Sequence, residues 1–236
     1  MGGATTIFKR EMVSYFYSPI AYVVIAVFLV FSGYFFATIL AMTQQATLAY
    51  SLANTQFILS ILAPVITMKL LSEEVRAGTI EMLVTAPVTD FEVVFGKFLA
   101  AWFLYLVMLA PTLLYVVFLK WVGQPDMGPI ISSYIGLTLM GGMFISVGLL
   151  MSALTRNQVI AGVSGIVALV ILFFVGYAAS GTESWYASAL QYIGTYGHWE
   201  PFTKGLVDTK DIIYYITIMS LCLFIAVRVV ESRKWR

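Results

Sequence analysis

The chain has 236 residues, of which 61% are hydrophobic and 11% charged, with a mean hydropathy of +0.93 and a net charge of +1. This composition excludes a soluble domain, and apolar runs of about 18 or more residues predict helices across a bilayer. The near-neutral charge argues against nucleic acid as a partner. One cysteine and one histidine argue against a disulfide framework or a metal site. We therefore expect an all-α integral membrane protein embedded in a lipid bilayer.

The first predicted element is an interfacial helix over residues 4–18. Its apolar side chains can share one face, opposite Lys9, Arg10 and Glu11, and Pro19 ends it. Six apolar runs then predict six transmembrane helices, at about 20–42, 55–71, 93–119, 130–154, 159–179 and 211–227. An even number of spans places both termini on one side of the membrane.

A polar island at residues 71–102 interrupts the apolar pattern between spans 2 and 3. Residues 73–84 contain no proline and interleave charged with apolar side chains, which predicts a short amphipathic helix at the membrane surface. Pro87 stops it, and Asp90 is the expected N-cap of the next helix. As a bare pattern, the segment fits either a connecting loop or an element that contacts a soluble partner.

Orientation follows from the lysine and arginine residues, which concentrate in cytoplasmic loops. Ten of the 13 lie on the side of the termini: Lys9, Arg10, Lys69, Arg76, Lys97, Arg156, Arg228, Arg233, Lys234 and Arg236. The other side has Lys120, Lys204 and Lys210. We therefore expect the termini and the polar island to face the cytoplasm, and the segment at residues 180–210 to face outward.

The chain lacks the residues that would let it supply its own energy. The apolar interiors of the predicted spans hold no ionisable side chain of the kind that ion-coupled carriers need. Gly96-Lys97 is not a nucleotide-binding P-loop, because Phe91 and Phe98 replace the required glycine and hydroxyl residue. With a single histidine, no catalytic triad can be assembled either. We expect a non-catalytic chain that binds no cofactor.

The polar island resembles the E-x3-GT-x-E-x-L-x-T-x-P … GK pattern of ABC-2 type transporter permeases. The matching residues are Glu74, Gly78, Thr79, Glu81, Leu83, Thr85, Pro87, Gly96 and Lys97. The resemblance implies that residues 73–84 form a cytoplasmic coupling helix that docks on a separate ATP-binding subunit, present in two copies and carrying the ATP and Mg. The expected docking residues are Glu73, Glu74, Arg76, Gly78, Thr79, Ile80, Glu81, Met82 and Leu83.

A narrower resemblance appears in the outer segment. His198, Phe202, Gly205, Asp208 and Asp211 are similar to the H-x3-F-x-x-G-x-x-D-x-x-D stretch of the gliding-motility-associated permease branch. The resemblance implies that these five residues contact a partner. That partner would be a second permease copy or a related membrane subunit, such as one with a large outer domain. The expected location of the chain is the inner membrane of a cell.

Three functions remain open on the sequence. The first is the permease subunit of an ATP-driven exporter of an unidentified substrate. The second is a mechanotransmitting subunit that relays ATPase motion to an outer partner without moving a substrate. The third, a scaffold or enzyme without an ATPase partner, is disfavoured by the coupling-helix motif. Small residues such as Gly148 and Gly165 indicate close helix contacts, either within one bundle or at a dimer seam.

Overall fold

The computed structural model describes residues 3–45, 47–78, 88–179 and 185–233, which form helices and no strand. Six helical segments are long and apolar enough to cross a membrane. They are α2 (Pro19–Thr43), α3 (Ala49–Thr67) with α4 (Ser72–Ala77), α6 (Asp90–Leu109) with η1 (Ala110–Thr112) and α7 (Leu113–Val122), α8 (Met127–Leu154), α9 (Gln158–Ala179) and α12 (Thr209–Arg233). The other helices are α1 (Gly3–Tyr17), α10 (Trp185–Ile193) and α11 (Thr195–Thr203). The predicted all-α fold with six membrane-spanning helices is confirmed.

Local capping fixes where several helices begin. Thr89 is the N-cap of α6: its hydroxyl accepts a hydrogen bond from the Glu92 N–H, and the Glu92 carboxylate accepts one from the Thr89 N–H. The prediction of Asp90 as the N-cap was therefore wrong by one residue, because Thr89 forms the capping box. Asn157 caps α9 by accepting a hydrogen bond from the Val159 N–H at 2.9 Å.

Three segments differ in extent from their predicted ranges. Helix α3 begins at Ala49 rather than near residue 55. Helix α4 ends at Ala77 and is followed by its C-cap Gly78, whose φ of +70° is left-handed. Residues 79–87, which include the rest of the predicted coupling helix (residues 79–84), lie outside the described residues. The outer segment, predicted only as a polar stretch, contains α10 and α11.

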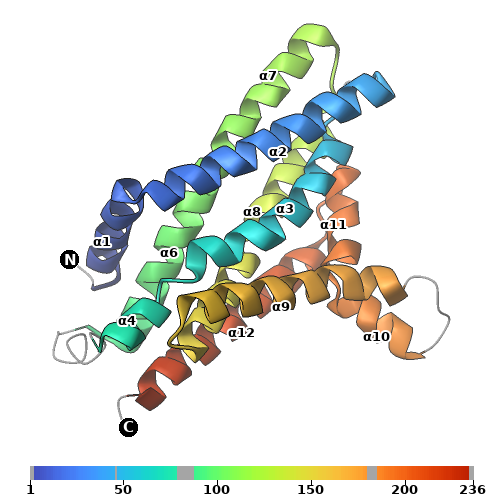
Figure 1. Ribbon diagram of the computed structural model, residues 1–236. Coiled ribbons are helices and arrows are strands. Elements are labelled where there is room, and N and C mark those ends of the chain that lie inside the picture. Colours follow the sequence, from blue (N-terminus) through green and yellow to red (C-terminus); the bar gives the residue numbers. More distant parts are fainter. Residues whose placement is uncertain (1–2, 46, 79–87, 180–184, 234–236) are drawn as a thin grey trace.

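Helix α8 is the centre of the bundle. It packs against α12, α3, α9, α11 and α6, and it is the most buried of the candidate spans. Figure 1 shows α1, α4 and the C-terminal end of the described chain at one end of the molecule, with α10 and α11 at the other. The bundle therefore has two polar ends, which are separated by the apolar lengths of its spans.

Small residues bring α8 and α9 close to α3 at Pro64. A Cβ atom on Gly148 would overlap the Thr67 hydroxyl, and one on Gly165 would lie 2.9 Å from the Pro64 Cβ. Neither position could carry a larger side chain without moving α3. Gly148 and Gly165 therefore serve packing within one bundle, the first of the two roles that the sequence left open.

Helix α1 lies on the first turns of α6. The N–H of Gly3 donates a hydrogen bond to Glu92 at 3.0 Å, and the rings of Phe8 and Phe103 meet edge to face. A Cβ atom on Gly96 would lie 2.8 Å from the carbonyl oxygen of Ala4. The glycine of the Gly96-Lys97 step is thus a point where the two helices approach closely.

We expect Gly96→Ala to displace α1 from α6. The added methyl group would press on backbone, and overpacking of this kind costs about 1–3 kcal/mol. The measurement is the unfolding temperature of the detergent-solubilised chain, with tryptic cleavage at Lys9 and Arg10 as a local readout. Gly33→Ala in α2, where a Cβ would meet its nearest neighbour at 3.4 Å, is the matched control. Equal behaviour of the two variants would contradict this packing.

Candidate functional site

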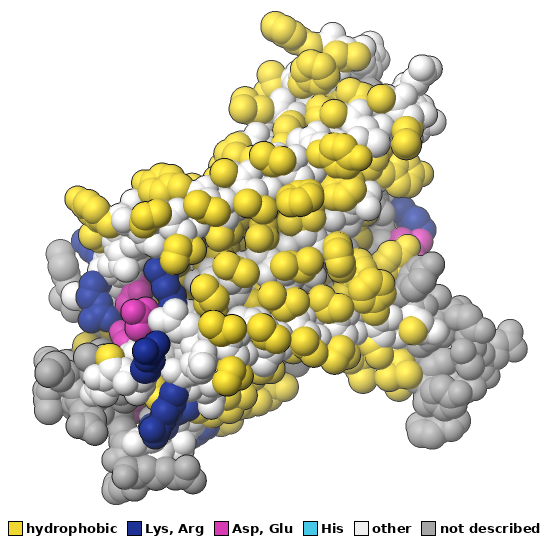
Figure 2. Space-filling view, in the orientation of Figure 1, with side chains coloured by type: hydrophobic (Ala, Val, Ile, Leu, Met, Phe, Trp, Pro, Cys, Tyr) yellow, Lys and Arg dark blue, Asp and Glu magenta, His cyan; other side chains and the backbone are white. Residues whose placement is uncertain are grey.

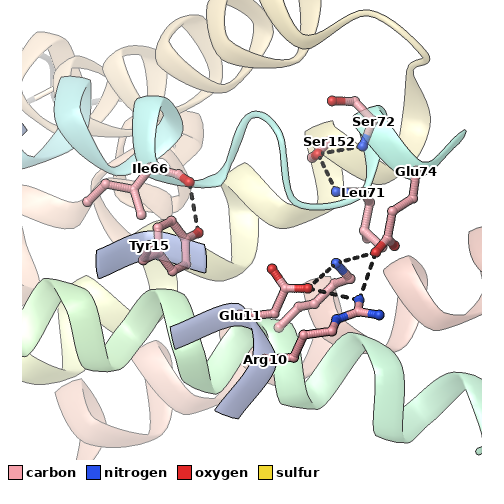
Figure 3. Close-up of polar contacts among 9 residues, drawn as sticks. Arg10, Glu11, Tyr15, Ile66, Leu71, Ser72, Glu74 and Ser152 are labelled. Carbon is pink, nitrogen blue, oxygen red and sulfur yellow. Dashed lines mark hydrogen bonds and ion pairs between the residues drawn. The ribbon is translucent and has the colours of Figure 1, made fainter. Parts of the chain in front are cut away.

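A ring of four charged side chains joins α1, α4 and α6 at the end of the bundle where α4 lies. The Lys97 ammonium lies 2.9 Å from Oε1 of Glu11 and 2.8 Å from Oε1 of Glu74. The Arg10 guanidinium lies 3.1 Å from each of the same two oxygens. Figure 3 shows Arg10 and Glu11 pointing toward Glu74. Cations and anions alternate around the ring, so each charge has two partners of opposite sign.

Burial makes this ring different from a surface ion pair. The Lys97 side chain is 2% exposed, and the Glu11 and Glu74 side chains are 14% and 18% exposed, whereas Arg10 is 58% exposed. A buried charge is retained only when partners compensate for its lost hydration. Lys97 therefore requires both carboxylates, and their helices, α1 and α4, are held to α6 through it.

The contacts of the ring lower the pKa of Glu11. Burial alone would raise the pKa of Glu11, but the charge of Lys97 and the hydrogen bonds from Lys97 and Arg10 outweigh it, so the pKa lies below the ordinary value of 4.5. A lowered pKa in the folded state means that ionised Glu11 stabilises the fold at pH values above 4.5. This contribution is lost as the pH falls below that value through the folded-state pKa.

We therefore expect Glu11→Gln to unfold at a lower temperature than the wild-type chain at pH 7. The difference should shrink as the pH is lowered below 4.5, where Glu11 becomes protonated in both states of the wild type. The measurement is the unfolding temperature of both proteins in detergent across this range. A difference that stays constant with pH would contradict the assignment of the effect to the charge of Glu11.

Helix α8 supplies a second attachment of α4. The Ser152 hydroxyl accepts hydrogen bonds from the N–H groups of Leu71 and Ser72, at 3.1 and 3.0 Å, and donates one to the Met68 carbonyl at 2.9 Å. Figure 3 shows the first two of these bonds. Backbone N–H groups at the start of a helix lack partners within the helix. Ser152 satisfies two of them, so α4 is fixed at its start by α8 and along its length by the ring.

Ser152→Ala is expected to weaken the attachment of α4 by about 1–3 kcal/mol, because it leaves two buried N–H groups without an acceptor. Protease susceptibility after Arg76 measures the local effect, and the unfolding temperature measures the global one. Ser232→Ala, which removes an exposed hydroxyl that bonds only to Val229 within α12, is the control. A result in which Ser152→Ala is as mild as the control would contradict this capping role.

The predicted docking residues divide into three groups. Glu74 points into the ring, whereas Glu73 and Arg76 are exposed on α4. Gly78 ends the helix and is exposed, and a Cβ atom added there would meet no other atom within 4 Å. The remaining five lie outside the described residues: Thr79, Ile80, Glu81, Met82 and Leu83. Contact with an ATPase stays a prediction for all nine.

The predicted partner-contact residues of the outer segment cluster between α11 and α12. Nδ1 of His198 lies 2.6 Å from Oδ1 of Asp211, and its Nε2 lies 2.9 Å from the Tyr192 carbonyl. The His198 ring also stacks on Tyr214 with 3.8 Å between ring centroids. His198 and Asp211 are both buried, so their observed contacts lie within this chain.

The other three members of this motif surround that pair. Phe202 is fully buried against α8, and its carbonyl accepts a hydrogen bond from Ser132 at 2.6 Å. Gly205 turns the chain with a φ of +85°, and Asp208 lies at the surface, where it pairs with Lys210 at 3.2 Å. The motif thus holds α11 against α8 and α12. Partner contact for these residues stays a prediction.

Sequence reasoning did not find the charge ring. Lys97 was considered only as a possible P-loop residue and as part of a family pattern. The sequence nevertheless places this lysine at the start of an apolar span. Glu11 lies 86 residues away from it in the chain, and no local pattern pairs residues over such a distance. The available signal was an ionisable residue at the start of an apolar span, which needs a partner where it is buried.

Within the described residues, the charge ring and Ser152 connect α4 to α1, α6 and α8. Among the described residues, no group of three or more His, Cys, Asp or Glu side chains could hold a metal ion. The fold and the site define a multi-pass membrane protein with a charged junction at one end of its bundle and a buried polar cluster at the other.

The chain matches the family model described as ABC-2 family transporter protein over residues 5–221, and it belongs to that family. It is therefore a membrane subunit of an ABC transporter, a class that partners with an ATP-binding subunit and is generally non-catalytic. The match extends from α1 into α12 and so includes both polar sites. None of the curated proteins compared with the chain matches it.

Proposed function

We propose that this chain is an ABC-2 permease subunit in which α4 receives the movement of a partner ATPase and passes it to the membrane helices. The charge ring is the observation that supports this most strongly, because Lys97 and Glu74 connect α4 to α6 through a buried ion pair. Ser152 adds the connection to α8. A displacement of α4 would therefore move α1 and the ends of α6 and α8 with it.

The rest of the assembly follows from this role. ATP and Mg would bind to two copies of the ATPase, and this chain would bind neither. Residues 73–84 would form the docking element, with Arg76 as a polar contact on its exposed face. A second permease copy or a related membrane subunit would complete the path. The chain would lie in the inner membrane, with both termini in the cytoplasm, and would export its substrate.

A relay to an outer partner is the second candidate function. Beside the buried His198–Asp211 pair, the outer surface exposes Leu206 at 57% and Val207 at 45%, and exposed apolar side chains of this kind suit a protein contact. Membership of the gliding-motility-associated branch would fit a partner with a large outer domain. In that case the motion received at α4 would end in the outer segment rather than in substrate transport.

Site-specific photo-crosslinking in cells tests the docking proposal. A photoreactive amino acid at Ala77, on the exposed part of α4, is expected to crosslink to a P-loop ATPase. The same group at Leu206, at the other end of the bundle, serves as the control and should yield no ATPase adduct. An ATPase adduct at Leu206, or no such adduct at Ala77, would contradict the proposed docking site and orientation.

A further inference from the structure

A polar cavity of about 360 Å³ lies beside the charge ring, between α1, the turn after α3, and α4. Ser14 and Tyr15 of α1, Lys69 of the turn and Glu73 of α4 line it together with the ring. Its volume equals that of about 12 water molecules at roughly 30 Å³ each. The cavity is thus large enough for a small polar group.

Most polar groups of the cavity are already satisfied by the protein. The four ring residues pair with one another, and the Tyr15 hydroxyl donates a hydrogen bond to the Ile66 carbonyl at 3.0 Å. Lys69 is different: its ammonium lies over the Tyr15 ring, 5.5 Å from the centroid, and among the described residues no carboxylate pairs with it. The cation–π contact holds this charge at the cavity.

Two further polar groups in the cavity also have no partner among the described residues. Glu73 is exposed and joins no ion pair, and the exposed Ser14 hydroxyl makes no hydrogen bond there. The cavity therefore presents one cation, one anion and one hydroxyl to a ligand. A zwitterion with an anionic oxygen group and a hydrogen-bond-donating ammonium is complementary to this set.

The cavity also lies at the level at which phospholipid head groups are expected to meet the protein. Helix α1 exposes the apolar side chains of Val13, Phe16 and Tyr17, as an interfacial helix does, and it leads directly into the span α2. Figure 2 shows apolar side chains along the spans and charged ones gathered at the end where α1 and α4 lie. A lipid whose chains lie along the apolar surface would place its head group at this level.

We propose that this cavity binds the phosphoethanolamine head group of a phospholipid. Lys69 and Ser14 would hold the phosphate, and Glu73 would accept hydrogen bonds from the ammonium. A phosphatidylcholine offers the same charges, but its quaternary ammonium has no N–H to donate. A phosphatidylglycerol lacks the cation that Glu73 needs.

Native mass spectrometry of the delipidated full chain tests this proposal. The chain is titrated with phosphatidylethanolamine, phosphatidylcholine and phosphatidylglycerol of identical acyl chains. Because each charge-assisted hydrogen bond is among the strong ones, we expect phosphatidylethanolamine to bind about tenfold tighter than the other two. Soluble phosphoethanolamine is tested as a competitor and should displace the lipid only at much higher concentration.

Three variants assign the contacts. Lys69→Gln should weaken phosphatidylethanolamine binding about tenfold, and Glu73→Gln should abolish the preference over phosphatidylglycerol. Lys9→Gln, which changes an exposed lysine of α1 that does not line the cavity, should bind like the wild type. None of the three residues belongs to the ring, so their unfolding temperatures should match the wild type.

Equal binding of all three lipids, or wild-type binding by both cavity variants, would overturn the proposal. If soluble phosphoethanolamine binds as strongly as the lipid, the ligand need not be a lipid, and the assignment of the ligand as a phospholipid is overturned. The ATPase is absent from this experiment, so its outcome is independent of whether α4 docks on an ATPase.

Discussion

Lys97→Met is expected to release α1 and α4 from α6. Methionine fits the space of the lysine stem, but it leaves the carboxylates of Glu11 and Glu74 together, with only the largely exposed Arg10 to compensate them. Removing one partner of a buried ion pair costs about 3–5 kcal/mol. The unfolding temperature in detergent should fall accordingly, and trypsin should cleave the chain after Arg76 more rapidly.

The matched control for this prediction is Lys120→Met. Lys120 lies exposed near the end of α7, far from the ring along the same candidate span, Asp90–Val122. It should leave both readouts close to wild type, because surface charges away from special contacts contribute little. If the two variants are equally stable, the ring does not hold these helices together, and the transmission path through Lys97 must be abandoned.

Asp211→Ala is expected to destabilise the opposite end of the bundle. Asp211 is fully buried, and its loss would leave His198 without the carboxylate at its Nδ1. Leaving a buried hydrogen-bonding group without its partner costs about 1–3 kcal/mol. The expected results are a lower unfolding temperature and faster proteolysis within residues 180–210.

The neighbouring acidic residue of the same motif provides the control. Asp208 pairs with Lys210 through side chains that are 47% and 64% exposed, and such surface pairs contribute about 0–1 kcal/mol. Asp208→Ala should therefore leave stability nearly unchanged. A larger loss from Asp208→Ala than from Asp211→Ala would show that the motif acts mainly through its exposed carboxylate, and the structural role assigned to the His198–Asp211 pair would be wrong.

The fold was largely predictable because the bilayer imposes a length and a polarity on every span. The positions of the turns and of the helix starts were harder to predict. Asp90 was the predicted N-cap of α6, whereas Thr89 takes this position because Glu92, three residues after it, completes the capping box. Helix α3 begins before its apolar run does, since the polar residues Asn54 and Gln56 lie within it. Hydropathy indicates which part of a helix crosses the membrane, but it does not indicate the residue at which the helix begins.

The sites were predictable only as local motifs. The sequence placed His198 and Asp211 in one pattern, but it did not reveal that their side chains meet inside the protein. The hydrogen bond between Ser152 and Ser72 joins residues 80 apart in the sequence, and the contact between Lys97 and Glu11 joins residues 86 apart. Such contacts depend on how the helices pack, and a single sequence does not specify that packing.

Co-purification tests the central claim, that an ATPase docks on the exposed face of α4. The full chain is isolated in detergent as wild type, as Arg76→Glu/Ala77→Glu and as the outer-end control Lys204→Glu/Leu206→Glu; Glu74 stays intact because it belongs to the ring. A P-loop ATPase that hydrolyses ATP should accompany the wild type and the control but not the α4 variant. If the α4 variant retains the ATPase, or no ATPase accompanies the wild type, the proposed docking on α4 is contradicted.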